Sequence, residues 1–211
     1  MYKKFGKRLI DLLLSAIGIV VLAPVWLILA IAIKIDDPGP VFFRQKRIAQ
    51  DKNGEQQFFQ IFKYRSMKMC TPKDTPTHLL ENPEQYITKI GGFLRKTSLD
   101  ELPQIFNIFA GQMSIIGPRP ALWNQDDLYE ERAKYGANGV KPGLSGWAQI
   151  NGRDELPIDV KAKLDGEYVE KLSFGFDVKC FFGTITSVLK HDGVVEGGTG
   201  AMEKEKEEAE K

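Results

Sequence analysis

The sequence predicts a mainly α-helical monotopic membrane protein, with a small β-hairpin and an N-terminal re-entrant helix-break-helix. Three observations lead to this fold class. An uncharged apolar run fills residues 12–33, apolar residues recur at helical spacing in later segments, and two short aromatic-rich segments flank a turn. We divide the chain into a membrane hairpin at 1–36, a compact cytoplasmic domain at 37–195 and a flexible charged tail at 196–211.

The apolar run is long enough to reach across a membrane. Its 22 residues carry no charge, and as one helix they would extend about 33 Å, against about 30 Å of hydrocarbon. A signal peptide is disfavoured because the run exceeds the usual ~7–15 residues and no small-x-small cleavage site precedes a polar segment. A buried helix of a soluble protein is disfavoured because the run has no polar face.

The flanks of the run and Pro24 favour a re-entrant hairpin. Basic residues stand on both sides, at Lys3, Lys4, Lys7, Arg8, Lys34, Arg44, Lys46 and Arg47. Positive residues mark the cytoplasmic side, so both ends are expected there. Pro24 lies near the middle of the run and breaks the helix, because proline lacks a backbone N–H and clashes with the preceding turn. A spanning helix kinked at Pro24 is the alternative.

The elements after the run follow from turn residues and periodicity. A turn cluster at 36–40 ends the membrane segment, and strands at 41–43 and 57–62 flank a hairpin turn at 51–54. Helices are predicted at 84–96, where Gly91 and Gly92 loosen the turn, and at 100–109, 122–134, 157–171 and 176–190. A proline-rich loop at 71–83, a rigid segment at 117–120 and a glycine-rich segment at 141–149 connect them.

Composition excludes several functional classes. Lys and Arg number 29 and Asp and Glu 28, a net charge of +1, so no nucleic-acid partner is expected. Two cysteines, Cys70 and Cys180, have no metal-ligand spacing, which excludes a disulfide scaffold or a zinc site. With only two histidines, a catalytic acid or nucleophile is expected to be a carboxylate.

Asp100 and Glu101 are the candidate catalytic pair. Pro103 is tolerated only in the first helical turn, which places both acids at a helix N-terminus, where the helix dipole favours ionised carboxylates. They could serve as a nucleophile and a metal ligand. Acids at helix starts also commonly act only as caps, and Thr97 or Ser98 could share that role.

Basic residues next to rigid turns suggest a phosphate substrate. The candidates are Lys63, Arg65, Arg95, Arg119 and Arg153. Arginine matches phosphate with a bidentate fork. Mg²⁺ takes one or two carboxylates plus substrate phosphates, which suits an Asp-Glu pair. The membrane segment adds the expectation that one substrate is a lipid.

These motifs together resemble a family, the bacterial sugar transferases that are small monotopic phosphoglycosyl transferases. Six segments, in the family's order over roughly residues 1–190, carry the resemblance: KRLID at 7–11, PGPVFFRQ at 38–45, FKYRSM at 62–67, RKTSLDELPQ at 95–104, GQMSIIGPRP at 111–120 and KPGLSGWAQINGR at 141–153. Ser145 stands where the family more often has Thr, and Ala23-Pro24 where it often has Ser-Pro.

The resemblance implies an activity and a location. Such enzymes transfer a phospho-sugar from a UDP-sugar to a polyprenyl phosphate, usually undecaprenyl phosphate, and release UMP. This step starts the assembly of a cell-surface glycan such as a capsule or exopolysaccharide. The implied location is the cytoplasmic face of the bacterial inner membrane, with a re-entrant helix and interfacial amphipathic helices in contact with membrane lipids.

The resemblance also implies residue roles. Asp100 would attack the sugar-linked phosphorus to form an aspartyl phospho-sugar, and Glu101, with Asp100, would bind Mg²⁺. Arg95, Arg119 and Arg153 would lie near the phosphates, with Lys63 and Arg65 as weaker candidates. Three alternatives stay open: direct attack by the lipid phosphate, a non-catalytic nucleotide-sugar-binding protein, and a plain membrane-anchored domain.

Two further expectations concern the surface. An apolar stripe on the helix at 176–190, with Val178, Phe181, Phe182, Ile185, Val188 and Leu189, predicts a second membrane-facing surface. The alternative is that this stripe packs in the core, which burial of the two phenylalanines would show. The sequence does not specify the sugar beyond a UDP-linked hexose, and it leaves open whether the chain forms a homo-oligomer.

Overall fold

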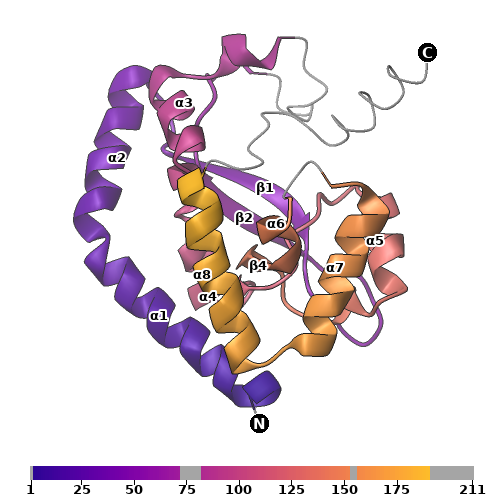
Figure 1. Cartoon of the computed structure of the whole chain (residues 1–211). Helices are drawn as coiled ribbons and strands as arrows, with labels where there is room; N and C mark the ends of the chain where they lie inside the picture. Colours follow the sequence, from indigo (N-terminus) through magenta and orange to yellow (C-terminus); the bar gives the residue numbers. More distant parts are fainter. Residues whose placement is uncertain (1, 72–81, 153–155, 191–211) are drawn as a thin grey trace.

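A computed structural model of the chain describes residues 2–71, 82–152 and 156–190 (Figure 1). The described part is mainly helical with one antiparallel hairpin, as predicted. Its elements are, in chain order, the π-helix η1 (Tyr2–Gly6), α1 (Lys7–Val21), α2 (Ala23–Asp36), β1 (Phe42–Ile48), β2 (Phe58–Tyr64), the 3₁₀ turn η3 (Pro83–Tyr86), α3 (Lys89–Lys96), the 3₁₀ turn η4 (Leu99–Glu101), α4 (Gln104–Phe109), β3 (Ser114–Ile116), α5 (Asp126–Ala133), η5 (Ala137–Gly139), β4 (Gly143–Ser145), α6 (Trp147–Ile150), α7 (Ile158–Lys171) and α8 (Phe174–Lys190).

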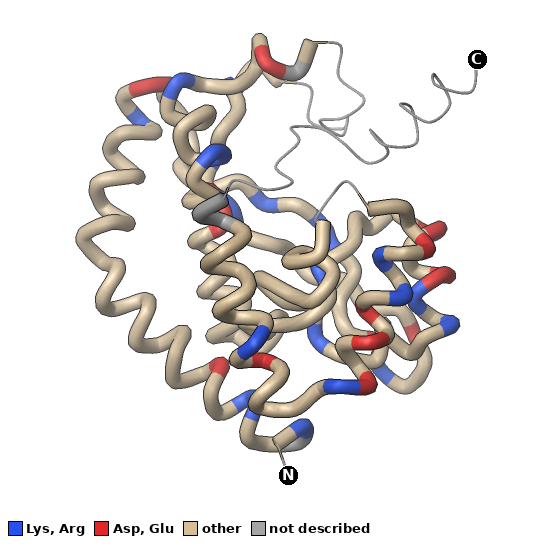
Figure 2. Tube along the Cα trace, in the orientation of Figure 1, with Lys and Arg blue, Asp and Glu red and all other residues tan. Residues whose placement is uncertain are grey.

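The N-terminal apolar run forms two helices, α1 and α2, that bend by 61° at Leu22. Pro24 lies in the first turn of α2, where its missing N–H costs nothing, so the break predicted at Pro24 is confirmed. In Figure 2 the charges of this helix pair gather at its two ends. Of the helices described here, none is long and apolar enough by itself to cross a membrane, and α1 with α2 meets that requirement only as a bent pair.

The predicted hairpin extends further than the sequence indicated. Strands β1 and β2 pair antiparallel from Phe42 opposite Tyr64 to Ile48 opposite Phe58. Its loop turns through Asn53 and Gly54, both with positive φ, as their residue types favour. The strand prediction left out the basic residues of β1 because they interrupt the apolar pattern. In the structure their side chains lie over aromatic rings of β2.

A second, parallel pair of three-residue strands, β3 and β4, was not predicted. Three residues are too few to show an alternating pattern. The pair depends on glycine, since a Cβ on Gly143 would lie 2.1 Å from the backbone nitrogen of Gly117. The rigid segment at 117–120 and the glycine-rich segment at 141–149 therefore contact each other through their backbones. Arg119 belongs to the rigid segment, two residues after Gly117.

Two predicted helices are divided in the structure. The prediction at 84–96 was wrong in its first half, because Thr88 is extended and its Oγ1 accepts a hydrogen bond from Gly91 N–H (2.9 Å), so α3 begins only at Lys89. The segment 100–109 likewise divides into η4 and α4. The predicted helix at 122–134 shortens to α5, whereas α7 and α8 agree with their predictions within two residues.

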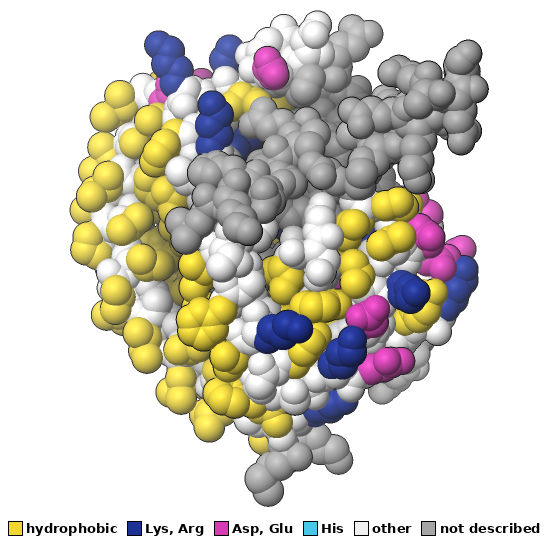
Figure 3. All heavy atoms as spheres, viewed as in Figure 1, with side chains coloured by type: hydrophobic (Ala, Val, Ile, Leu, Met, Phe, Trp, Pro, Cys, Tyr) yellow, Lys and Arg dark blue, Asp and Glu magenta, His cyan; other side chains and the backbone are white. Residues whose placement is uncertain are grey.

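Helix α8 leaves its apolar stripe uncovered. Phe181 and Phe182 are 45% and 61% exposed, so core packing of the stripe is wrong. Figure 3 shows hydrophobic side chains over α8 and along the outer side of α1 and α2. The core positions of α8 are instead Cys180 and Asp177, which face α7 and β3. The side chains of Val188 and Leu189 and the predicted tail at 196–211 lie outside the described residues.

Candidate active site

Asp100 and Glu101 lie in the 3₁₀ turn η4, between α3 and α4. Ser98 enters the turn with a φ of 56°, and Pro103 takes the N-cap position of α4. Neither Thr97 nor Ser98 caps a helix start here: Thr97 Oγ1 donates back to Phe93 O of α3 (2.8 Å). No side chain caps η4 or α4, so the reading of the two acids as simple caps is wrong.

The Glu101 carboxylate is held by two cations from other elements. Lys63 of β2 approaches Glu101 Oε1 with its Nζ at 2.9 Å, and Arg119 approaches the same oxygen with its Nη2 at 3.1 Å. Burial alone would raise the pKa of Glu101, but the charges and hydrogen bonds of Arg119 and Lys63 outweigh burial and hold the pKa well below its usual range. Glu101 is therefore a permanently ionised centre of the site.

Asp100 differs from Glu101 in its contacts. No described residue donates a hydrogen bond to its carboxylate or pairs with it at ion-pair distance. Burial, helped by the charge of Glu101, raises its pKa although Lys63, Arg95 and Arg119 act in the opposite direction. A desolvated carboxylate among cations is suited to nucleophilic attack or to metal binding.

Three of the five basic candidates, Lys63, Arg95 and Arg119, lie near the acids. Lys63 and Arg119 contact Glu101, and Arg95, whose Nε donates to Ser66 Oγ (3.0 Å), is near enough to lower the pKa of Asp100. The side chain of Arg119 is 36% exposed and can reach a ligand. The structure thus brings together the candidates from four separate segments of the chain. Arg153 lies outside the described residues.

Arg65 does not join the acids. Its guanidinium donates to the carboxylate and the carbonyl oxygen of Asp37 and to Pro40 O, and it is buried in that turn. These bonds fix the chain at the end of α2, so the structure uses Arg65 to shape the turn. Arg65 stands two residues after Lys63, a spacing that would place both side chains on one face of a strand. Strand β2 ends at Tyr64, however, so this alternation does not extend to Arg65.

Asn107 is a residue that sequence reasoning missed. It is fully buried, accepts a hydrogen bond from Phe62 N–H (3.0 Å) and donates to Gln60 O (2.8 Å), so it fixes α4 against β2. Lys63 follows on β2 and Glu101 precedes α4, so this amide joins the two elements that carry the ion pair. An isolated asparagine within the apolar segment Ile105–Phe109 was the available signal.

The comparison with known proteins decides the family. A family model described as bacterial sugar transferase matches residues 2–191. The chain belongs to the bacterial sugar transferase family. All the contacts of the site, from Lys63 to Arg119, lie within the matched residues of this sugar transferase.

Named relatives of this sugar transferase differ in length. A UDP-glucose:undecaprenyl-phosphate glucose-1-phosphate transferase of Escherichia coli (strain K12) is 38% identical over 186 residues, which cover 85% of this chain and 39% of the relative. The uncharacterized sugar transferase EpsL of Bacillus subtilis (strain 168) is 38% identical over 189 residues, 89% of both chains. A UDP-N-acetylgalactosamine-undecaprenyl-phosphate N-acetylgalactosaminephosphotransferase of Aeromonas hydrophila is 34% identical over 190 residues, 88% of this chain and 44% of the relative. The chain thus spans about two-fifths of the length of the longer relatives.

The donor set of this sugar transferase fits a hard divalent cation that a substrate helps to bind. No group of three or more His, Cys, Asp or Glu side chains arranged for a metal occurs among the described residues. Asp100 and Glu101 supply two adjacent carboxylates, and Mg²⁺ commonly binds one or two carboxylates and completes its shell with water and phosphate oxygens. Mg²⁺ itself stays a prediction.

Proposed function

We propose that this sugar transferase moves a phospho-sugar from a UDP-sugar to undecaprenyl phosphate and releases UMP. The contrast between Asp100 and Glu101 carries the proposal. Two adjacent carboxylates share one turn, yet one is ion-paired to Lys63 and Arg119, and the other has no hydrogen-bond donor among the described residues and a raised pKa. In such a pair, one carboxylate binds the cations of the site and the other can react with substrate. The names of the relatives from E. coli and A. hydrophila support the reaction class.

The reaction would proceed in two displacements at one phosphorus. An oxygen of ionised Asp100 attacks the phosphorus that carries the sugar, and the bond from that phosphorus to the bridging oxygen breaks, so UMP leaves with that oxygen. An oxygen of the lipid phosphate then attacks the same phosphorus and displaces the Asp100 carboxylate. Covalent catalysis divides the transfer into two steps, so the site never has to hold two large polyanions that react directly.

The cations would stabilise charge as it develops. Glu101 holds Arg119 and Lys63 in place. Arg95 lies in the last turn of α3, just before η4. Cations fixed in place need little reorganisation when phosphoryl charge builds up in the transition state. A bound Mg²⁺ would supply further Lewis-acid stabilisation of the diphosphate. The proline on each side of Arg119 limits the freedom of its backbone.

The N-terminal helices and α8 support a location at the cytoplasmic face of the bacterial inner membrane. The outward side chains of α1 and α2 are apolar and exposed, among them Ile17, Val20, Leu27 and Ile28. Both ends of the pair carry basic residues. Such a bent pair fits a re-entrant hairpin that enters and leaves by one face, and this placement would bring the site near a lipid substrate.

The test is UMP release from a panel of UDP-sugars. Purified full-length protein in vesicles receives UDP-glucose, UDP-N-acetylgalactosamine or UDP-N-acetylglucosamine, with Mg²⁺ and with or without undecaprenyl phosphate. We expect continuous UMP release with lipid, and without it a burst of at most one equivalent per site together with a hydroxylamine-labile phospho-sugar on the protein. Turnover without burst or label would favour direct attack by the lipid phosphate. No release from any sugar would leave the non-catalytic binding protein as the better reading.

A further inference from the structure

Two carboxylates of the N-terminal helix pair bind backbone amides of the catalytic domain. Asp11 of α1 accepts a hydrogen bond from Ile115 N–H (3.0 Å), and Asp36 at the end of α2 accepts one from Ile90 N–H (2.7 Å). Asp11 is 3% exposed although it stands on a helix whose outer side is apolar. A buried carboxylate on such a helix is costly unless it is hydrogen-bonded. These contacts therefore act as specific attachment points.

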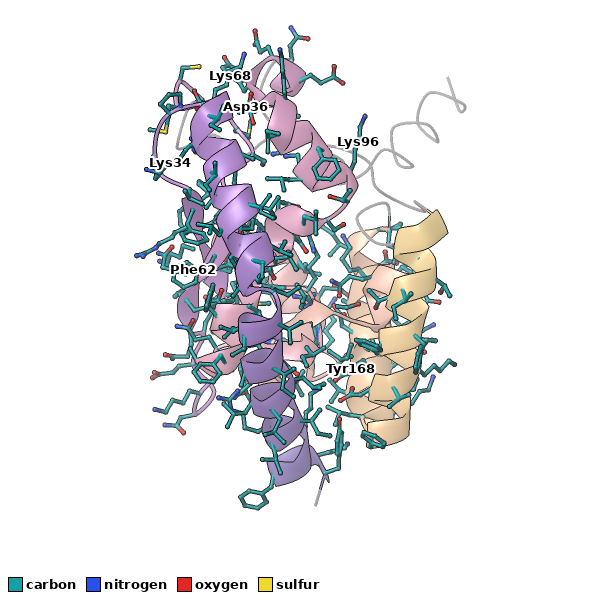
Figure 4. The ribbon with its side chains drawn as sticks, turned by 90° about the vertical axis from the view of Figure 1, so that its left-hand side faces the viewer. Lys34, Asp36, Phe62, Lys68, Lys96 and Tyr168 are labelled. Atoms are coloured by element: carbon teal, nitrogen blue, oxygen red, sulfur yellow. The ribbon has the colours of Figure 1, made fainter. Side chains whose placement is uncertain are left out.

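Each attachment lies on an element that leads into the site. Ile115 is the middle residue of β3, and the chain continues from β3 through Gly117 and Pro118 to Arg119. Ile90 lies in the first turn of α3, whose last turn carries Arg95 and leads into η4. Figure 4 shows Asp36 at the upper end of α2, where this helix meets α3. The two carboxylates thus hold the two segments that deliver Arg119 and Arg95.

A third contact secures α4, the helix that follows Asp100 and Glu101. Arg8 of α1 donates from its guanidinium to Ile108 O (2.7 Å) and Phe109 O (2.8 Å), the last carbonyls of α4. Helix α1 also packs closely on α4, since a Cβ on Gly18 would lie 2.5 Å from Ile105 Cδ1. The helix pair therefore contacts three elements next to the site, β3, α3 and α4.

We propose that Asp36 and Asp11 are positioning residues that make the geometry of the Asp100–Glu101 site depend on the docked helix pair. Neither touches the acids, and each acts through the element it holds. An enzyme built this way assembles its cations correctly only while α1 and α2 hold their places beside the domain, which ties activity to the state of the membrane hairpin. The proposal rests on the proposed function.

The test compares Asp36→Ala with Asp36→Asn in full-length protein in vesicles. Alanine removes the acceptor of Ile90 N–H, whereas the side-chain oxygen of asparagine keeps it. We expect kcat per folded protein to fall about 10- to 100-fold in Asp36→Ala, since a misplacement of about 1 Å can cost 10²-fold, with KM for the UDP-sugar changed less. Asp36→Asn should recover most of this rate. Asp11→Ala and Asp11→Asn should repeat the pattern.

The matched control is Asp51→Ala. Asp51 is also a half-buried carboxylate with one tertiary hydrogen bond, from Tyr129 OH (3.0 Å), but it joins the hairpin loop to α5 and no segment of the site. We expect its kcat per folded protein to equal that of the wild type. Equal kcat in Asp36→Ala and wild type, equal losses in the Ala and Asn variants, or an equal loss in Asp51→Ala would overturn the proposal. Failure of both alanine variants to fold would show a purely structural role. A wild type that releases no UMP refutes instead the proposed function.

Discussion

At the scale of single residues, Asp100 and Glu101 show how two adjacent acids come to differ. They share a turn and a chemical type but differ in their contacts. Glu101 is ion-paired to Lys63 and Arg119, whereas Asp100 is desolvated and receives no hydrogen bond from the described residues. Opposite pKa shifts follow from these surroundings, so each residue can be tested on its own.

Asp100→Asn should abolish turnover and stabilise the fold. The amide keeps the size of the side chain but removes the attacking oxyanion, so turnover should fall on the order of 10³-fold or more, about 4 kcal/mol of barrier. The raised folded pKa means that ionisation of Asp100 is unfavourable in the folded protein, and its contribution to stability decreases as pH rises through the folded pKa. At pH 7 the neutral variant should therefore melt at a higher temperature. Calorimetry and UMP release check both results, and a lower melting temperature would contradict the assigned pKa shift.

Glu101→Gln should shift the pH profile to lower pH. Because attack requires ionised Asp100, activity of the wild type should be lost as pH falls through a pKa above about 3.9, the ordinary aspartate value. Burial, the main cause of the raised pKa of Asp100, remains in the variant, but the added effect of the Glu101 charge is removed while Lys63, Arg95 and Arg119 still lower the pKa. A carboxyl ¹³C NMR titration of Asp100 and the acidic limb of the residual rate should move together. Raised Mg²⁺ should partly restore the rate if Glu101 is a metal ligand, and an unchanged titration would contradict the electrostatic account.

At the scale of elements, α3 shows why two neighbouring glycines have different roles. A Cβ on Gly91 would lie 2.0 Å from the backbone oxygen of Ser66, whereas a Cβ on Gly92 would meet only Ile87 Cγ2 at 3.9 Å. Gly91 therefore allows α3 to pack against the segment after β2. This close approach at Gly91 was not predicted from the sequence.

Gly91→Ala and Gly92→Ala should have opposite effects on stability. Gly91→Ala forces α3 away from Ser66, whose Oγ binds Arg95, so both melting temperature and activity should fall. Gly92→Ala fits without a clash and gains helix propensity, about 0.5–1 kcal/mol. Thermal unfolding of the two variants measures the difference. An unchanged melting temperature of Gly91→Ala would show that α3 does not pack on Ser66 as described, and a fall in Gly92→Ala would contradict the open space beside Gly92.

At the scale of the whole molecule, exposed apolar side chains gather on particular helices. They cover the outer side of α1 and α2 and the stripe on α8, whereas α5 and α7 on the opposite side carry most of the visible charge (Figures 2 and 3). A continuous apolar surface of this kind would aggregate in water unless something covers it. A membrane would provide this cover under the proposed function.

The re-entrant topology can be tested with cysteines at both ends of the helix pair. Lys3→Cys and Lys34→Cys, each in a Cys70→Ser background, should react with a thiol reagent confined to the cytoplasmic side and not with one confined to the periplasm. Both side chains are exposed, so lack of reaction would not come from burial. The wild-type protein, in which Cys70 is exposed on the catalytic domain, provides the positive control for the cytoplasmic reagent. Periplasmic labelling of either position would show that the pair spans the membrane.

The stripe on α8 can be tested by charge. Phe182→Asp should weaken binding to vesicles of anionic phospholipid and leave the melting temperature in detergent unchanged, because the ring is 61% exposed and contributes little to the core. Val160→Asp is the control, being apolar and 37% exposed on α7, a helix that lies away from α1 and α2 in Figure 1. Cosedimentation measures the binding. Equal binding of the two variants would remove α8 from the membrane-facing surface.

Local patterns predicted much of this molecule. The uncharged run and Pro24 determined the bent helix pair, periodicity determined α7 and α8, and an Asn-Gly turn determined the hairpin. These elements follow from the sequence because each depends on residues close together in the chain, through backbone geometry or periodicity. The grouping of Asp100, Glu101 and Arg119 in one candidate site came instead from the resemblance to a known family.

Tertiary structure alone decided which charges meet. Lys63 and Arg65 are two residues apart, yet only Lys63 reaches Glu101, because Arg65 is held by Asp37 at the end of α2. In the sequence, Asp11 belongs to a motif and Asp36 to a turn cluster. Only the packing of α1 and α2 shows that Asp11 binds β3 and Asp36 binds α3. The pKa values of Asp100 and Glu101 diverge for the same reason: burial and the approach of distant cations are set by the packing of separate segments, and no local pattern contains those distances.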